Sequence, residues 1–191
     1  TLNKLREISG VYAGDLREAH EKGCIFAKET AMAPVDKPYD LVITSNSGYP
    51  LDLNIYQSVK GMSAAMQVVR KGGDILIAAE CWDGIPENTD FERMLTAVDN
   101  IDDLYDYVVK HEKNFQDTWQ IFYEVLIQRW ANVSLYTDKL DDGTVRKAHF
   151  NPVQDPEALI GKILEKHGKE ARICILPEGP LTIPYIKNNL K

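Results

Sequence analysis

Four short apolar runs, separated by stretches with helical periodicity, constrain the fold of this chain more than any other feature of its sequence. Each run is a continuous series of mostly aliphatic residues, which is typical of strands buried on both faces of a sheet. Such strands form a parallel sheet when helices alternate with them. We therefore predict an α/β protein of three layers, with a mainly parallel central sheet covered by helices on both faces. The predicted strands lie near residues 40–44, 74–79, 132–136 and 171–176.

The stretches between these runs carry amphipathic patterns. The clearest runs from about Asn54 to Lys71, where apolar residues repeat at intervals of four and three, as on one face of a helix. Asp52 or Asn54 can cap its start, and Gly72-Gly73 is predicted to end it. Further helices are predicted over residues 14–30, 89–98, 101–110, 117–131 and 156–167, and a turn over residues 141–143. The apolar face of the first of these is formed by Leu16, Ala19, Cys24, Phe26 and Ala27.

Length and composition narrow the class of protein. A chain of 191 residues buries one good core, so residues 1–191 are predicted to form a single domain. The net charge of −7 and the lack of a Lys/Arg cluster argue against a nucleic-acid partner. No apolar run approaches the ~20 residues of a membrane span, so no membrane partner is expected. Three cysteines without a CxxC pair indicate reduced thiols and a cytoplasmic location. The N-terminal residues are polar and charged, so no signal peptide is predicted. The chain also begins without Met, which is expected both of a fragment and of a processed chain.

The segment from Ser45 to Lys60 is the strongest candidate site. It follows the first predicted strand and opens the helix, and α/β sheets bind ligands where strand ends and helix N-termini converge. Tyr56 and Gln57 stand four and three residues before Lys60, which places a phenol, an amide and an ammonium on adjoining surface. This group suits a small carboxylate or a phosphate. On spacing alone, a solvated surface lysine beside a turn shaped by glycine and proline is an equal alternative.

A second loop, at residues 80–87, leaves the sheet on the same edge and is expected to face Tyr56, Gln57 and Lys60 across one crevice. Its Cys81 is a possible nucleophile, although a buried cysteine is the commoner case when no paired histidine is visible. The four histidines lack HxH and HxxxH spacing, so no metal site is predicted. Neither GxGxxG nor a P-loop occurs, which leaves dinucleotide and nucleotide sites without support.

The run SGYPLDLNIYQSVKGMSAA, followed by GGDILIAAECWDG, resembles the C-terminal domain of the nickel-dependent lactate racemase family. More diffuse similarity extends over most of the chain, including the segments 117–120 and 176–179. The residues that carry the specific match are Tyr49-Pro50, Asp52, Asn54, Tyr56-Gln57 and Lys60-Gly61.

This resemblance implies a two-domain enzyme that racemises or epimerises a small 2-hydroxy acid by hydride transfer with a nickel-pincer nucleotide. The family's tether lysine, nickel histidine and catalytic histidines belong to an N-terminal domain whose motifs this chain lacks. The implied partners are therefore that N-terminal domain and the 2-hydroxy acid. No cofactor or metal is expected on this chain, its cofactor-binding residues are unknown, and alone it is predicted to be inactive.

The resemblance also assigns roles to residues of this chain. Lys60 and Gln57 would orient the carboxylate and an oxygen of the substrate as the catalytic pair. Tyr56 would line the same pocket, and Trp119 would form an apolar wall, although on residue type alone Trp119 is more often a packing residue.

Departures from the family pattern leave the substrate open. Ser47 stands where the family has glycine, and the loop at 82–88 has one glycine and no histidine, whereas this loop is often glycine-rich with a histidine in the lactate enzymes. Other 2-hydroxy acids and sugar-derived acids are therefore substrates to consider beside lactate. Two other functions remain: an S-adenosylmethionine-type methyltransferase, suggested by the helix–GG–strand pattern at 68–76, and a non-catalytic module that binds small anions through Lys60.

Overall fold

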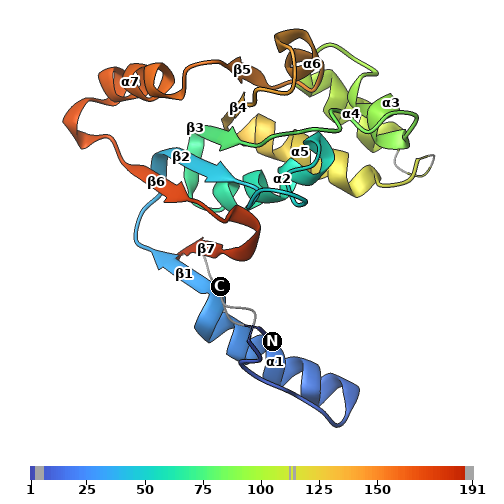
Figure 1. Cartoon of the computed structure of the whole chain (residues 1–191), viewed down its shortest axis with the longest axis vertical. Coiled ribbons are helices and arrows are strands. Elements are labelled where there is room, and N and C mark those ends of the chain that lie inside the picture. The colour runs from blue at the N-terminus through green and yellow to red at the C-terminus, as the bar shows by residue number, and fades with distance from the viewer. Residues whose placement is uncertain (3–6, 112, 114, 188–191) are drawn as a thin grey trace.

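A sheet of five parallel strands forms the centre of the structure, a computed structural model that describes residues 1–2, 7–111, 113 and 115–187 (Figure 1). The strands lie in the order β5 (Asn151–Val153), β4 (Asn132–Tyr136), β3 (Val69–Ala78), β2 (Tyr39–Ser45) and β6 (Ile173–Leu176). The four predicted strands are therefore confirmed as members of one parallel sheet.

Helices cover both faces of this sheet, which confirms the three-layer prediction. On one face α2 (Ile55–Met66) and α5 (Thr118–Trp130) pack against the strands, and α3 (Asp90–Leu95) and α4 (Ile101–His111) pack on α5. On the other face α7 (Pro156–His167) buries Ile163 against aliphatic residues of the strands. The buried residues in that second cluster are Leu41, Leu76, Val153 and Ile163.

The boundaries of α2 correct one prediction. The helix starts as expected, because the Asn54 side chain caps it by accepting from the main-chain N–H of Gln57. It ends at Met66, however, and Gly72-Gly73 lies inside β3, where the pairing with β2 shifts register. Val69 lies three residues after Met66 and is buried in the same core as α2, so in the sequence it looks like one more residue of the apolar face of the helix. In the structure, however, Val69 is the first residue of β3.

The predicted turn at 141–143 is also wrong. Asp141 caps a short helix, α6 (Asp142–Lys147), through a 3.0 Å bond from the main-chain N–H of Thr144 to its carboxylate. The same residue type favours both turns and helix caps, so the sequence alone did not separate the two structures.

A second, two-stranded parallel sheet was not predicted. It pairs β1 (Met32–Val35) with β7 (Ile183–Ile186), and β7 follows a short 3₁₀ helix, η2 (Gly179–Leu181). A further 3₁₀ turn, η1 (Gly168–Glu170), follows α7. Figure 1 shows this small sheet between the central sheet and the N-terminal helix.

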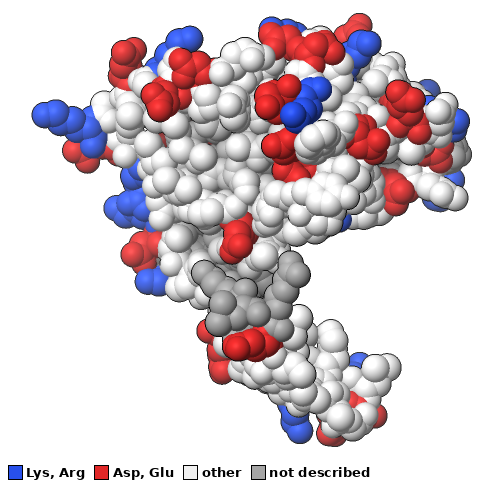
Figure 2. Space-filling model, in the orientation of Figure 1, with Lys and Arg blue, Asp and Glu red and all other residues white. Residues whose placement is uncertain are grey.

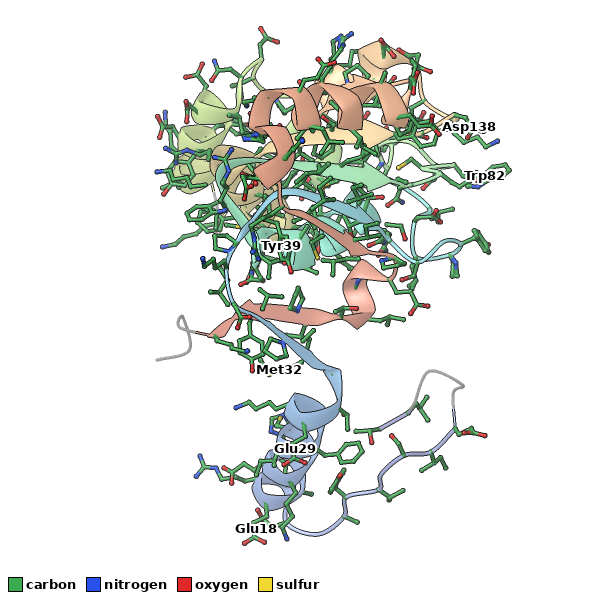
Figure 3. The ribbon with its side chains drawn as sticks, turned by 90° about the vertical axis from the view of Figure 1, so that its left-hand side faces the viewer. Glu18, Glu29, Met32, Tyr39, Trp82 and Asp138 are labelled. Carbon is green, nitrogen blue, oxygen red and sulfur yellow. The ribbon has the colours of Figure 1, made fainter. Side chains whose placement is uncertain are left out.

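The helix α1 (Leu16–Ala31) confirms the helix predicted at 14–30. None of its residues is buried, and Leu16 is 87% exposed. Figure 3 shows α1, marked by Glu18 and Glu29, projecting from the body beyond Met32. The apolar face is thus only partly covered among the described residues, where the Tyr12 ring contacts the Phe26 ring at a centroid distance of 6.1 Å.

The surface carries charges of both signs. On the face drawn in Figure 2, acidic and basic side chains are interspersed over the upper body. Within the described part of the chain, no helix combines the length and the apolar character needed to cross a bilayer.

Candidate functional site

The topology of the sheet marks one position for a ligand. From β2 the chain moves outward through β3, β4 and β5, whereas β6 lies on the other side of β2. In open α/β sheets, ligands bind outside the carboxyl ends of the strands at the point where the strand order reverses. Here that point lies between β2 and β6, and α2 and η2 begin there. Figure 3 shows the carboxyl edge, where Trp82 and Asp138 follow β3 and β4.

The loop after β2 is fixed by a fully buried amide. The Asn46 side chain donates to the carbonyls of Leu51 and Gln57, and accepts from the main-chain N–H of Gly61 at 2.9 Å. Gln57 and Gly61 are four residues apart in α2, so the carbonyl and the N–H that the Asn46 amide contacts are the two groups that pair with each other in a regular α-helix. Asn46 therefore ties the loop to the helix that carries the candidate site.

Two glycines allow the segments at this point to approach closely. A Cβ on Gly61 would lie 2.7 Å from the carbonyl oxygen of Ser45, and a Cβ on Gly179 would lie 2.6 Å from Oγ1 of Thr44. The Ser45 hydroxyl also donates to the carbonyl of Pro177 at 2.5 Å. The start of η2 is thereby held against β2 and α2.

Lys60 and Gln57 lie together at this edge, as predicted. The Lys60 ammonium donates to Oε1 of Gln57 at 2.6 Å, and the Lys60 side chain is exposed. An open pocket of about 410 Å³ lies beside Lys60, between α2, α5 and η2. Its lining residues are Val59, Lys60, Ser63, Trp119, Gln120, Tyr123 and Pro180.

Tyr56 and Trp119 form the aromatic side of the site. Their rings meet edge to face with centroids 6.4 Å apart, and Trp119 meets Tyr123 in the same way. Tyr56 is half-buried, and burial raises the pKa of its phenol, with a further contribution from the Asp117 carboxylate. Trp119 is 53% exposed and lines the Lys60 pocket, whereas Tyr56 lies behind Trp119.

The loop at 80–87 does not line this pocket, so the prediction of one shared crevice is wrong. The loop packs on the start of α2 instead, where the N–H of Ile55 donates to the carbonyl of Gly84 at 2.9 Å. It lines a separate pocket of about 1140 Å³ with α3 and α6. The Cys81 thiol is buried beside Ser58, and burial raises its pKa to about 11, so it is a packing residue and not a thiolate nucleophile.

Sequence reasoning missed Asn46, Asp117 and Gln120. Asp117 precedes α5 in the left-handed region, with φ of 56°, and makes no side-chain cap bond to that helix. A non-glycine residue in this conformation is a signal of function or strain, but only a structure reveals it.

No group of three or more metal-ligating side chains comes together among the described residues. The three cysteines are free. Cys24 lies beside His20 on the exposed helix α1, and neither residue lines the Lys60 pocket.

The structure is that of an α/β domain with a parallel sheet, and an open pocket beside Lys60 lies near the switch point of that sheet. The chain belongs to the family of lactate racemase C-terminal domains, whose sequence model matches residues 35–183.

Two curated relatives are lactate racemases. The protein from Lactiplantibacillus plantarum is 32% identical over 182 residues, and that from Thermoanaerobacterium thermosaccharolyticum is 37% identical over 184 residues. Both alignments cover 93% of this chain, which spans only 42% of the length of each relative.

One solved structure supports the same assignment, and a second shares the fold. The lactate racemase apoprotein from T. thermosaccharolyticum aligns with a TM-score of 0.85 at 32% identity, over 96% of this chain and 44% of that chain. A Thermotoga maritima protein aligns with a TM-score of 0.62 over 90% of this chain and 42% of its own, but at 15% identity it shows the fold alone.

The family assignment removes the methyltransferase alternative. That alternative depended on a helix ending at Gly72-Gly73 before a strand, and the structure places both glycines within β3. The resemblance to the lactate racemase family is confirmed.

Proposed function

We propose that this chain is the substrate-binding domain of a racemase or epimerase that acts on a small 2-hydroxy acid. The observation that carries the proposal is the 2.6 Å contact of Lys60 with Gln57, at the switch point of the sheet and beside the Trp119 pocket. The relatives named lactate racemase support the reaction class.

In this proposal Lys60 binds the substrate carboxylate. A 2-hydroxy acid is an anion at neutral pH, and the ammonium supplies the opposite charge in a charge-assisted hydrogen bond. Gln57 directs Oε1 to Lys60, which leaves its amide nitrogen as a donor for a second substrate oxygen. A carboxylate held at two points presents its α-carbon in a fixed orientation.

The aromatic residues have a different role. Trp119 covers one side of the pocket with apolar surface, and Tyr56 supports Trp119 from behind. An apolar wall excludes water and so strengthens the electrostatic contact at Lys60.

The described residues do not fit the nickel-pincer nucleotide implied by the resemblance, since this chain lacks the family's motifs with the tether lysine and the nickel histidine. No set of three or more metal-ligating side chains comes together among the described residues either. We propose that an N-terminal domain of a longer protein holds this group, which would supply the hydride-transfer chemistry. The chain spans 42% of its curated relatives, which is consistent with a partner domain. A cytoplasmic location also remains a proposal, supported by the free thiols.

The decisive experiment is Lys60→Ala in the protein that joins this chain to the proposed N-terminal domain. Turnover of lactate and of sugar-derived 2-hydroxy acids should fall by about 10²-fold or more, because substrate positioning is lost. Bound nickel, measured by mass spectrometry, should not change. Lys162→Ala on the exposed surface of α7 is the matched control and should behave as the parent. Near-parental turnover of Lys60→Ala would remove Lys60 from the mechanism.

The separate 191-residue chain tests the division of labour. We expect it to contain no nickel and to racemise none of these acids, since the cofactor is proposed to bind elsewhere. Stoichiometric nickel in an untagged preparation would contradict the two-domain proposal. If the longer protein also lacks activity while the chain binds 2-hydroxy acids through Lys60, the anion-binding module becomes the better description.

A further inference from the structure

Gln120 makes a contact that the proposed function has not used. It lies in the first turn of α5, directly after Trp119, and its side chain is 1% exposed. Its Nε2 donates to the main-chain carbonyl of Tyr56 at 2.5 Å. Tyr56 is in the first turn of α2, so this bond joins the starts of the two helices that border the Lys60 pocket.

The bond fixes a position that ring contacts alone would hold weakly. Trp119 contacts Tyr56 and Tyr123 edge to face, and each such contact contributes little stabilisation by itself. A buried amide must retain its partner, because a buried donor without an acceptor bears the full cost of losing its hydrogen bonds to water. Gln120 therefore specifies where the α5 backbone that carries Trp119 lies relative to α2.

We infer that Gln120 is a positioning residue that holds Trp119 over the substrate pocket by anchoring α5 to the carbonyl of Tyr56. The role in catalysis rests on the proposed function, since it requires that the Lys60 pocket bind the substrate. Gln120 acts through the backbone and Trp119, and it has no proton or charge to contribute to the reaction.

The same helix contains a matched control. Gln128 lies two turns after Gln120, and its Nε2 donates to the main-chain carbonyl of Ala148 at 3.2 Å. Both glutamines therefore link α5 to a neighbouring main-chain carbonyl, but only Gln120 lies at the pocket. A general loss of stability would follow from either substitution, whereas a change at Trp119 should follow from Gln120→Leu alone.

The first measurement uses ¹⁹F NMR of the 191-residue chain labelled with 5-fluorotryptophan. The chain has three tryptophans, Trp82, Trp119 and Trp130, and Trp119→Phe assigns the resonance of interest. Gln120→Leu should shift or broaden the Trp119 resonance and leave the other two in place, which also shows that the variant is folded. Gln128→Leu should leave the Trp119 resonance near its parental position. If Gln120→Leu does not fold, Gln120→Met replaces it, since Met is unbranched and adapts to core spaces.

An unchanged Trp119 resonance in a folded Gln120 variant, or an equal change in Gln128→Leu, would overturn the inference. In the longer protein, Gln120→Leu should lower kcat/KM by about 10-fold or more, whereas Gln128→Leu should stay near the parental value.

The proposed function and the positioning role of Gln120 would fail in different ways. If Lys60→Ala keeps its turnover while Gln120→Leu moves Trp119, the proposed function fails and the positioning role stands. If Lys60→Ala is inactive while Trp119 does not move, the positioning role fails and the function stands.

Discussion

At the scale of single residues, the side chains that shape the site bond to main chain. Asn46 is completely buried and spans the loop after β2, the first turn of α2 and Gly61. A polar residue directly after an apolar run looks like an ordinary loop residue in the sequence. Its role depends on the missing side chain of Gly61, fifteen positions later, which no local pattern connects to it.

We expect Asn46→Ala to lower the stability of the chain by about 2–4 kcal/mol, because it leaves buried main-chain groups without partners. Urea unfolding followed by circular dichroism measures this change. Asn132→Ala is the control, since Asn132 is exposed and donates to the Asp74 carboxylate at 3.2 Å. Equal stability losses in the two variants would contradict the central place given to Asn46.

Ser47 explains one departure from the family pattern in physical terms. It adopts φ of 68°, in the left-handed region, and Gly48 follows it with φ of 73°. Glycine enters this region without steric cost, which accounts for the glycine that the family places here. In this chain, therefore, a serine occupies a backbone conformation that favours glycine.

At the scale of elements, strands buried on both faces were predictable from sequence and strands containing proline were not. The four apolar runs were found because aliphatic residues follow one another without interruption. The unpredicted strands β1, β5 and β7 each contain a proline, at positions 34, 152 and 184. Proline cannot donate to a neighbouring strand, so such strands lie at sheet edges, where the sequence signal is weak. The Lys60 and Gln57 positions were predictable because helical spacing fixed them.

Helix α5 contains a polar series on its buried side that its sequence did not reveal. Gln120, Glu124 and Gln128 follow one another at intervals of four residues. The Glu124 carboxyl is fully buried and accepts from Nε2 of Gln128 at 3.2 Å, and its Oε2 has no partner among the described residues. Burial raises the pKa of Glu124 well above its usual range, and the Gln128 bond opposes that rise.

This carboxyl makes stability depend on pH. The pKa of Glu124 is higher in the folded chain than its unfolded value of about 4.3, so the unfolded state releases its proton first as the pH rises. The stability of the parent should therefore fall from about pH 4.3 upward until the folded pKa is reached. Glu124→Gln should remove this dependence, and its Tm advantage should grow between pH 4 and pH 8.

Each pKa unit corresponds to about 1.4 kcal/mol, and 1 kcal/mol corresponds to roughly 2–4 °C in Tm for a chain of this size. Differential scanning calorimetry over that pH range provides the measurement. Glu165→Gln, which makes the same substitution on the exposed surface of α7, is the control. A pH-independent difference for Glu124→Gln would mean that Glu124 ionises normally in the folded chain.

At the scale of the whole molecule, α1 is an amphipathic helix that the described residues cover only in part, through contacts such as that of Tyr12 with Phe26. Its periodicity was sufficient to predict the helix, because helical spacing is a local property. What covers a helix is not local, and here nothing in the described part of the chain buries any residue of α1. A helix with little tertiary packing is only marginally stable in water.

We therefore expect the amide hydrogens of α1 to exchange much faster than those of α5 in the 191-residue chain. Hydrogen exchange followed by mass spectrometry compares the two helices directly. In the longer protein, the protection of α1 should rise if the proposed N-terminal domain packs against it, while that of α5 should change little. Equal protection of α1 and α5 in the chain alone would show that α1 is stable without a partner.

The parallel pairing of β1 with β7 has a mechanical consequence. Met32 pairs with Ile183 and Val35 with Ile186, so the end of β1 that receives α1 and the end of β7 that leads to the C-terminus lie at opposite ends of the ribbon. Tension applied between α1 and the C-terminal segment would load all of its hydrogen bonds in shear at once, instead of opening them one at a time. Because η2 precedes β7 directly, a pull on this ribbon would also reach Pro180 at the wall of the Lys60 pocket.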